Sequence, residues 1–207
     1  MANYSIEDED DFDFEYEGYL EEYASIQSIV REALPFELIA VVGGIISGIL
    51  LSGMTEEIEM IPGLLVLVPG IMGLRGNISS SLGSRLTSAI HMGLIDGVDW
   101  KNKELQNNIV GSMVLTVIIS FLLGVLSHSV SVVLGLQSAG LLKLTFISVT
   151  AGFISGILLA ILSAYLAVGT FRLGLDPDNI VTPAIATVGD ILSMMTIFFV
   201  ARLVLYI

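Results

Sequence analysis

Cysteine is absent from the 207-residue sequence, so the chain can form no disulfide, no thiolate nucleophile and no cysteine-ligated zinc site. Charged residues are also scarce, at 14%, against 54% hydrophobic residues. The mean hydropathy of +0.87 lies far above that of an ordinary soluble domain. The composition therefore indicates an integral membrane protein.

Basic residues are few, eight Lys and Arg in all, and they form no cluster. Proteins that bind nucleic acid neutralise phosphates with a basic surface, so we expect no nucleic-acid partner. The sequence has no phosphate-binding loop motif and therefore does not imply ATP. The N-terminus is acidic rather than basic and then apolar, so we do not expect a signal peptide.

Acidic residues gather at the N-terminus, where eleven of the 21 lie within residues 1–32 beside one base, Arg31. Two parts follow from this distribution. Residues 1–34 are expected to form an acidic cytoplasmic tail, and residues 35–207 a membrane domain.

Apolar residues after the tail form five long stretches: 35–54, 61–93, 109–136, 144–171 and 180–207. A helix of about 20 apolar residues spans the hydrocarbon core of a bilayer. Backbone amides in hydrocarbon must be paired internally, and nothing alternates as a β-barrel would require. The sequence therefore predicts an all-α integral membrane protein with five transmembrane helices.

The basic residues near the ends of these stretches predict an orientation in a cell membrane. Four fall on one side: Arg31, Lys101, Lys103 and Arg172. Two, Lys143 and Arg202, fall on the other. The excess places the N-terminus in the cytoplasm and the C-terminus outside.

The second stretch is unusual because it contains prolines, glycines and the polar residues Arg75, Asn77 and Arg85. Proline removes an amide donor and glycine weakens a helix, so we expect this helix to be broken beside a ligand. Four glycines fall roughly on one helical face: Gly70, Gly73, Gly76 and Gly83. The alternative is a kinked helix that uses its glycines for packing.

Asp190 is the one acidic residue deep in the last stretch. A carboxylate at such depth is costly and usually faces a cavity or a partner. The alternative is a structural ion pair with Arg75 or Arg85. An intramembrane aspartyl protease would need a second aspartate, so we do not expect an enzyme.

Other polar or small residues have structural interpretations. Asp176 is a predicted N-cap with Pro177 at the first helical position, and Asp178 is also interpreted as part of that helix start. Two pairs of glycines are expected to pack helices together, Gly44 with Gly48 and Gly152 with Gly156. His91 and His128 share no metal-ligand spacing and are interpreted as structural.

Two regions of the sequence resemble the MgtE family of Mg²⁺ transporters, particularly its eukaryotic solute-carrier relatives. In the second stretch the resemblance is carried by Pro69-Gly70, Gly73, Gly76-Asn77 and Ser84-Arg85-Leu86-Thr87-Ser88-Ala89. In the last stretch it is carried by Gly174-Leu175-Asp176-Pro177-Asp178-Asn179, Pro183 and Gly189-Asp190. The resemblance covers about residues 35–207.

This resemblance implies a homodimer with a pore on the twofold axis, lined by the second and fifth spans. It implies a central Mg²⁺ site at Asp190, with the carbonyl of Ala186 one turn earlier and Thr182 a further turn back. The vicinity would be completed by positions in the second span: Gly70, Gly73, Gly76 and Asn77. The cytoplasmic sensor domains of bacterial members have no counterpart in this sequence.

Mg²⁺ prefers oxygen ligands and gives up water reluctantly, so its first shell is expected to be mostly water. Two copies of Asp190 across a twofold axis would balance a divalent charge. No cofactor is expected beyond Mg²⁺ as transported and regulatory ion. The acidic residues 7–22 are either a solvated tail or a gate that internal Mg²⁺ closes. A secondary transporter of another small solute or cation is the alternative function.

Overall fold

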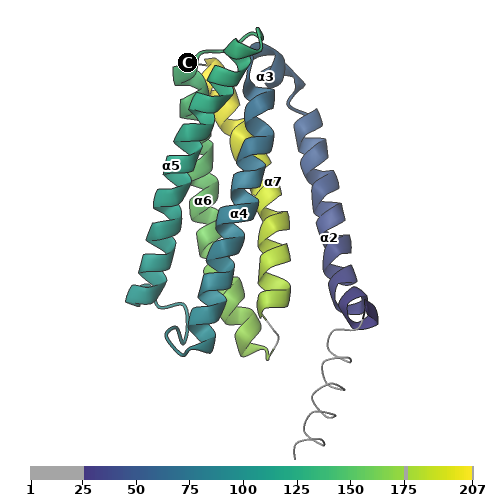
Figure 1. Cartoon of the computed structure of the whole chain (residues 1–207), viewed down its shortest axis with the longest axis vertical. Helices are drawn as coiled ribbons and strands as arrows, with labels where there is room; N and C mark the ends of the chain where they lie inside the picture. Colours follow the sequence, from purple (N-terminus) through teal and green to yellow (C-terminus); the bar gives the residue numbers. More distant parts are fainter. Residues whose placement is uncertain (1–25, 175–176, 207) are drawn as a thin grey trace, which may run out of the picture. The chain divides into compact units, whose positions relative to one another are not determined.

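The computed structural model describes residues 26–174 and 177–206 (Figure 1). Every regular element in these residues is a helix, as predicted. The helices are α2 (Ile26–Ser52), α3 (Thr55–Met60), α4 (Leu64–His91), α5 (Lys103–Val133), α6 (Leu141–Arg172) and α7 (Pro177–Tyr206). Residues 1–25 of the predicted acidic tail, and the predicted cap Asp176, lie outside the described residues.

Five of these helices are long and overlap the five predicted stretches, although α2 begins nine residues before residue 35, within the predicted tail, and α5 six residues before residue 109. Within the described residues, three are long and apolar enough to cross a membrane: Lys103–Val133, Leu141–Arg172 and Ile180–Tyr206. A shorter apolar segment, Glu37–Ser52, lies within α2. Multi-pass membrane character therefore rests on these three helices.

The predicted break in the second stretch was wrong, because residues 64–91 form one continuous helix. Pro62 and Gly63 precede α4, and Gly63 adopts a left-handed φ of 96° that favours glycine. Pro69 lies in the second turn, where it removes a single backbone hydrogen bond. The helix continues because its apolar face packs on neighbouring helices along its length.

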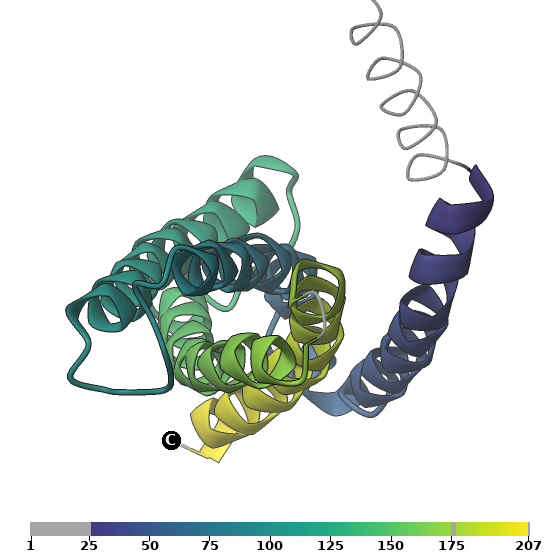
Figure 2. The ribbon, with the colours of Figure 1, turned by 90° about the horizontal axis from the view of Figure 1, so that it is seen from below.

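The chain divides into two compact units, residues 1–38 and 39–207. In the second unit, α4, α5, α6 and α7 form a bundle whose consecutive helices run antiparallel (Figure 1). α4 packs against α5, α6 and α7, and α6 packs against α5 and α7. Figure 2 shows these four helices from one end.

Two apolar clusters occupy opposite halves of this bundle. One joins the beginnings of α4 and α6 to the end of α7, with Leu67 and Ile197 at its centre. The other joins the ends of α4 and α6 to the beginning of α7, around Leu86 and Ile185. The residues between the clusters hold the polar side chains considered next.

Candidate metal centre

A belt of polar residues separates the two apolar clusters at the middle of the bundle. It comprises residues 72–81 of α4, 152–158 of α6 and 186–193 of α7, which we call the polar belt. Four of its polar side chains are buried: Arg75, Ser79, Ser155 and Ser193. Buried polar side chains also occur elsewhere in the bundle, but the polar belt contains both Arg75 and Asp190, so it is the level at which to seek a cation site.

Arg75 is buried, with 1% of its surface exposed. Its Nη2 donates a hydrogen bond of 2.8 Å to the carbonyl oxygen of Gly152 on α6. A Cβ on Gly156 would lie 3.0 Å from Nη1, so the Gly152–Gly156 pair leaves room for the guanidinium. The predicted packing role of this pair is confirmed, and part of what it packs is an arginine.

Asp190 does not form the ion pair considered as an alternative. Among the side chains that the structure describes, which exclude those of residues 26–29, 32, 33, 36 and 177–179, the one ion pair found joins Arg202 Nε to Glu57 Oε1 at 3.6 Å. Arg75 bonds to α6, and Arg85 Nη2 donates a 2.7 Å hydrogen bond to Ser112 Oγ on α5. The half-buried carboxylate of Asp190 therefore has no cationic partner in this part of the protomer.

The contacts of two glycines fix the height of Asp190 along α4. A Cβ on Gly83 would lie 3.0 Å from Val181 and 3.1 Å from Ile185. A Cβ on Gly189 would lie 3.7 Å from the Cβ of Arg75. Asp190 thus lies at the level of Arg75, and Asn77 is only two residues, about 3 Å along the axis, from that level.

One face of α4 is exposed in the protomer, and from Asn77 onward its residues are polar. It consists of Gly73, Asn77, Ser81, Ser84 and Ser88, which we call the uncovered stripe. These positions are three or four residues apart and so share a helical face. The sequence predicted a site role for none of the three serines, although Ser84 and Ser88 carry part of the family resemblance and their spacing with Asn77 was the signal that would have indicated a shared face.

The residues proposed for α7 also share one face. Thr182, Ala186 and Asp190 follow each other at intervals of four and are all half-buried. α4 packs on α7, so both groups of proposed site residues belong to the same pair of helices.

The four glycines of α4 do not share one open face, contrary to our expectation. Gly73 and Gly76 have no atom within 4 Å of an added Cβ. A Cβ on Gly70 would collide with Leu123 of α5, and Gly83 faces α7. Successive residues of an α-helix are rotated by 100° about its axis. Gly70 and Gly83, at the two ends of the set, therefore face different helices.

The glycine of α2 that packs closely on another helix is not one of the two that were predicted to do so. Gly44 and Gly48 face open space, which contradicts their predicted packing role. A Cβ on Gly43 would instead collide with Cγ2 of Thr187, three residues before Asp190.

Within the described residues, no group of three or more His, Asp or Glu side chains could hold a metal ion. His91 packs edge-on against Phe171 at 5.4 Å, and His128 Nδ1 lies 2.8 Å from Ser138 Oγ, as expected of structural residues. One protomer therefore presents a single carboxylate at the polar belt, together with hydroxyl, amide and backbone oxygens.

Comparison with known proteins identifies relatives of this chain. Solute carrier family 41 member 2 of Xenopus laevis is 28% identical over 187 residues, which is 86% of this chain and 32% of the relative. Solute carrier family 41 member 3 of Rattus norvegicus is 32% identical over 148 residues, 66% of this chain and 31% of the relative. The magnesium transporter MgtE of Thermus thermophilus is 26% identical over 170 residues, 81% of this chain and 35% of the relative.

The chain spans about a third of the length of these curated relatives. The sequence model of the MgtE family, described as a divalent cation transporter, matches residues 68–200. This match includes most of α4 and α7 and the whole of the polar belt. The chain belongs to the MgtE family of divalent cation transporters.

Proposed function

We propose that this chain transports divalent cations, Mg²⁺ foremost, across a membrane along a path lined by α4 and α7. The observation that carries the proposal is Asp190, a half-buried carboxylate at mid-height with no cationic partner in the described protomer. A carboxylate left in this state within a membrane domain needs a cation. Family membership and the relative named as a magnesium transporter support the choice of ion.

The path is proposed to run along the uncovered stripe and the adjacent face of α7. Asn77 and the serines offer oxygen atoms that hold the waters of a hydrated ion, while Asp190 supplies the charge. The backbone of Gly73 and Gly76 is open, so an ion with its water shell could approach the helix there. Thr182 and the carbonyl of Ala186 would continue the path along α7.

The active unit is proposed to be a homodimer with this path on its twofold axis. One protomer brings one carboxylate to the polar belt, and two would balance one divalent charge. The uncovered stripe would then face its copy instead of lipid. All five long helices would cross the membrane, with the N-terminus cytoplasmic and the C-terminus outside.

The membrane potential suffices to drive this transport. It supplies about 2.3 kcal/mol per elementary charge at 100 mV, hence about 4.6 kcal/mol for a divalent cation. This corresponds to an accumulation of more than a thousandfold at ~1.4 kcal/mol per decade. No nucleotide or other cofactor is required for uptake.

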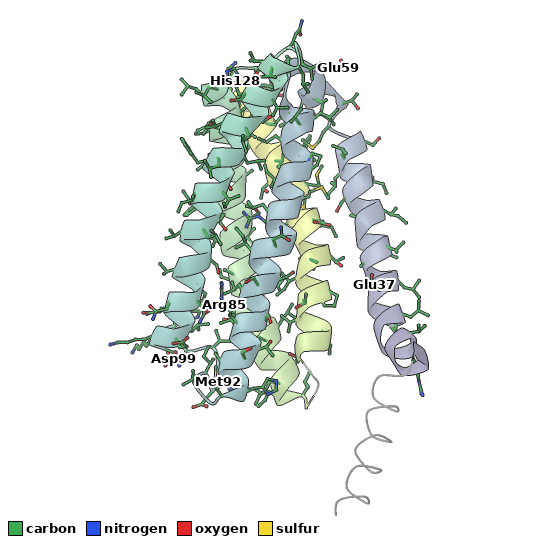
Figure 3. All side chains as sticks on the ribbon, in the orientation of Figure 1. Glu37, Glu59, Arg85, Met92, Asp99 and His128 are labelled. Atoms are coloured by element: carbon green, nitrogen blue, oxygen red, sulfur yellow. The ribbon has the colours of Figure 1, made fainter. Side chains whose placement is uncertain are left out.

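The test is flux into liposomes that contain the purified chain, with Mg²⁺, Ca²⁺ and Na⁺ measured side by side. We expect Mg²⁺ flux from the wild type. We expect Asp190→Asn to lower it at least about tenfold, because each subunit loses its carboxylate and the dimeric site loses both. Glu59→Gln, which removes an exposed carboxylate of α3 at one end of the bundle (Figure 3), is the matched control. Wild-type flux from Asp190→Asn would remove this residue from the path, and metal-independent uptake of another solute would favour the alternative transporter class.

The dimer can be tested by cross-linking, because the natural chain has no cysteine and a disulfide in a single-cysteine variant must join two copies. We expect Ser81→Cys on the uncovered stripe to form cross-linked dimers in lipid under mild oxidation. Val133→Cys at the exposed end of α5, 83% exposed, is the control and should remain monomeric. Monomer from both variants would contradict a path on the twofold axis.

Regulation is proposed to involve the acidic N-terminal residues, which internal Mg²⁺ would bridge to close the path. Weak binding at many sites is expected, because carboxylates that merely follow one another in sequence form no preorganised cage. Deletion of residues 2–24 should therefore abolish inhibition of flux by internal Mg²⁺. Equal inhibition of the truncated and full-length chains would make the tail a solvated leader.

A further inference from the structure

A groove of about 560 Å³ lies between α4 and α5. Arg85 comes from α4 and stands near the end of the bundle that carries Asp99 and Met92 (Figure 3). The remaining lining residues come from α5: Glu104, Asn107, Asn108, Gly111, Val114, Leu115 and Ile118. None of these residues is used in the cation path.

The guanidinium of Arg85 has more donors than partners. Its Nη2 is bonded to Ser112 Oγ at 2.7 Å, and among the side chains that the structure describes, which exclude those of residues 177–179, no carboxylate lies within 4.0 Å of it. Arg85 is six residues from the end of α4 at His91, or about 9 Å along the axis. An arginine at that depth in a membrane segment calls for an anion.

Glu104 brings the opposite charge to the same groove. The amide Nδ2 of Asn108 donates to Glu104 Oε1 at 3.2 Å and to the Glu104 carbonyl oxygen at 3.0 Å. The hydrogen bonds to Ser112 and Asn108 thus engage the two charges separately, and they form no ion pair with each other. The groove therefore offers one positive and one negative group with space between them.

Nearby aromatic residues and the change of polarity along the lining indicate where the groove lies relative to the membrane surface. Trp100 packs edge-on against Tyr165 with ring centroids 6.5 Å apart, beside the start of α5. Trp and Tyr of this kind are typical of the membrane–water interface. From Glu104 to Ile118 the lining passes from polar to apolar over 14 residues, about 21 Å of helix, which is comparable with one leaflet and its headgroups.

We infer that this groove binds a phospholipid whose headgroup carries both a phosphate and a primary ammonium, as phosphatidylethanolamine does. The phosphate accepts hydrogen bonds from Arg85, the ammonium donates to Glu104, and one acyl chain lies along Val114, Leu115 and Ile118. A trimethylammonium headgroup has no N–H to donate to Glu104, and a phosphatidylglycerol headgroup presents neutral hydroxyls to Glu104 in place of a cation. The lipid ties α5 to α4 beside Ser84 of the uncovered stripe.

The experiment is native mass spectrometry of the full-length chain, released from nanodiscs of equal parts phosphatidylethanolamine, phosphatidylcholine and phosphatidylglycerol. We expect the wild type to retain phosphatidylethanolamine about tenfold over the other two, an advantage of the size given by one or two charge-assisted hydrogen bonds. Arg85→Gln and Glu104→Gln should each abolish that preference. Lys143→Gln and Glu59→Gln, exposed charges outside the groove, are the matched controls and should keep it.

Several outcomes would overturn this inference. Equal retention of all three lipids shows that the groove does not select a headgroup, and preference for phosphatidylglycerol shows that Arg85 acts alone. If Arg85→Gln fails to fold, Glu104→Gln decides, because Glu104 is exposed in the first turn of α5. Disulfide dimers from Val114→Cys would assign the groove to a second copy of the chain instead. None of these results depends on whether the chain transports Mg²⁺.

Discussion

Arg75 and Asp190 lie at the same level of two packed helices and carry opposite charges, yet they do not pair. The guanidinium of Arg75 turns into the bundle, where a carbonyl of α6 accepts one hydrogen bond and two glycines leave it room. The carboxylate of Asp190 is half-buried and has no such enclosure.

The difference shows that a membrane bundle can keep two opposite charges at one level apart by giving one of them a partner on another helix. A salt bridge between the two would satisfy both and leave nothing for a ligand. Because Arg75 bonds to α6, it leaves Asp190 without a cationic partner within the described residues, as the proposed cation site requires. Substitutions near the two charges either remove this separation or measure how much each charge contributes to stability and to Mg²⁺ flux.

The largest effect is expected from truncation of the enclosed charge. Arg75→Ala leaves a cavity between α4 and α6 and removes the 2.8 Å hydrogen bond to the Gly152 carbonyl, so it should lower stability by about 3 kcal/mol or more. Arg75→Met retains most of the volume without the charge and should stay within about 1.5 kcal/mol of the wild type.

Thermal unfolding in detergent measures this difference, and liposome flux is the companion measurement. Arg75→Met should retain transport, because the guanidinium that it removes points away from the proposed path. Loss of flux in a folded Arg75→Met variant would mean that both charges act on the transported ion. Arg75 would then not have a purely structural role.

Narrowing the space around Arg75 should have the next largest effect. A Cβ on Gly152 would collide with Ser120 Oγ and lie 3.5 Å from Arg75 Nη2, so Gly152→Ala should destabilise the bundle by about 1–3 kcal/mol. Gly169→Ala on the same helix meets no atom within 4 Å and should be neutral or slightly stabilising. Equal melting temperatures for the two variants would show that the close approach is not needed.

A smaller effect is expected from a substitution on the uncovered stripe, near the level of Asp190. Asn77→Leu removes a polar group from the uncovered stripe at the level of Asp190, and we expect Mg²⁺ flux to fall about tenfold, equivalent to 1.4 kcal/mol. The melting temperature should hardly change, because Asn77 is exposed in the protomer. Asn107→Leu, on α5 and away from the stripe, is the control in the flux assay. A loss of stability in place of flux would identify Asn77 as a packing residue.

The smallest effect is expected at the ion pair that the bundle does form. Arg202 is half-exposed, lies 5.3 Å from the centre of the Phe198 ring and is 3.6 Å from Glu57, whose side chain is 3% exposed. Arg202→Gln should cost about 1 kcal/mol, because an exposed arginine is screened but Glu57 loses its partner. Lys143→Gln removes an exposed cation without a partner and should change nothing measurable. No difference between the two would mean that Glu57 is satisfied by solvent.

The long helices could be predicted from the sequence because bilayer thickness and backbone pairing leave few alternatives. The start of α7 at Pro177 was also predictable from local rules for helix ends. The continuity of α4 was not, because the penalty for Pro69 and the glycines is offset by contacts with helices distant in the sequence. The same cause explains why Gly43, and not Gly44 or Gly48, contacts α7.

Asp190 could be singled out from the sequence because a carboxylate deep in an apolar helix is rare. The separation of Arg75 from Asp190 could not, because helix periodicity gives a face but not the neighbour that occupies it. The groove with Arg85 and Glu104 was likewise invisible, since it depends on which side of α5 meets α4.

The enclosure of Arg75 also has a consequence for how the chain enters the membrane during synthesis. An arginine at the centre of a helix opposes insertion by about 2.5–3.5 kcal/mol on the translocon scale. α4 is not among the helices apolar enough to cross alone, and its partner carbonyl at Gly152 is made later, in α6. The ribosome must therefore add more than 70 residues before α4 gains the acceptor that favours its transmembrane position, so α4 and α6 are expected to insert as one cooperative unit.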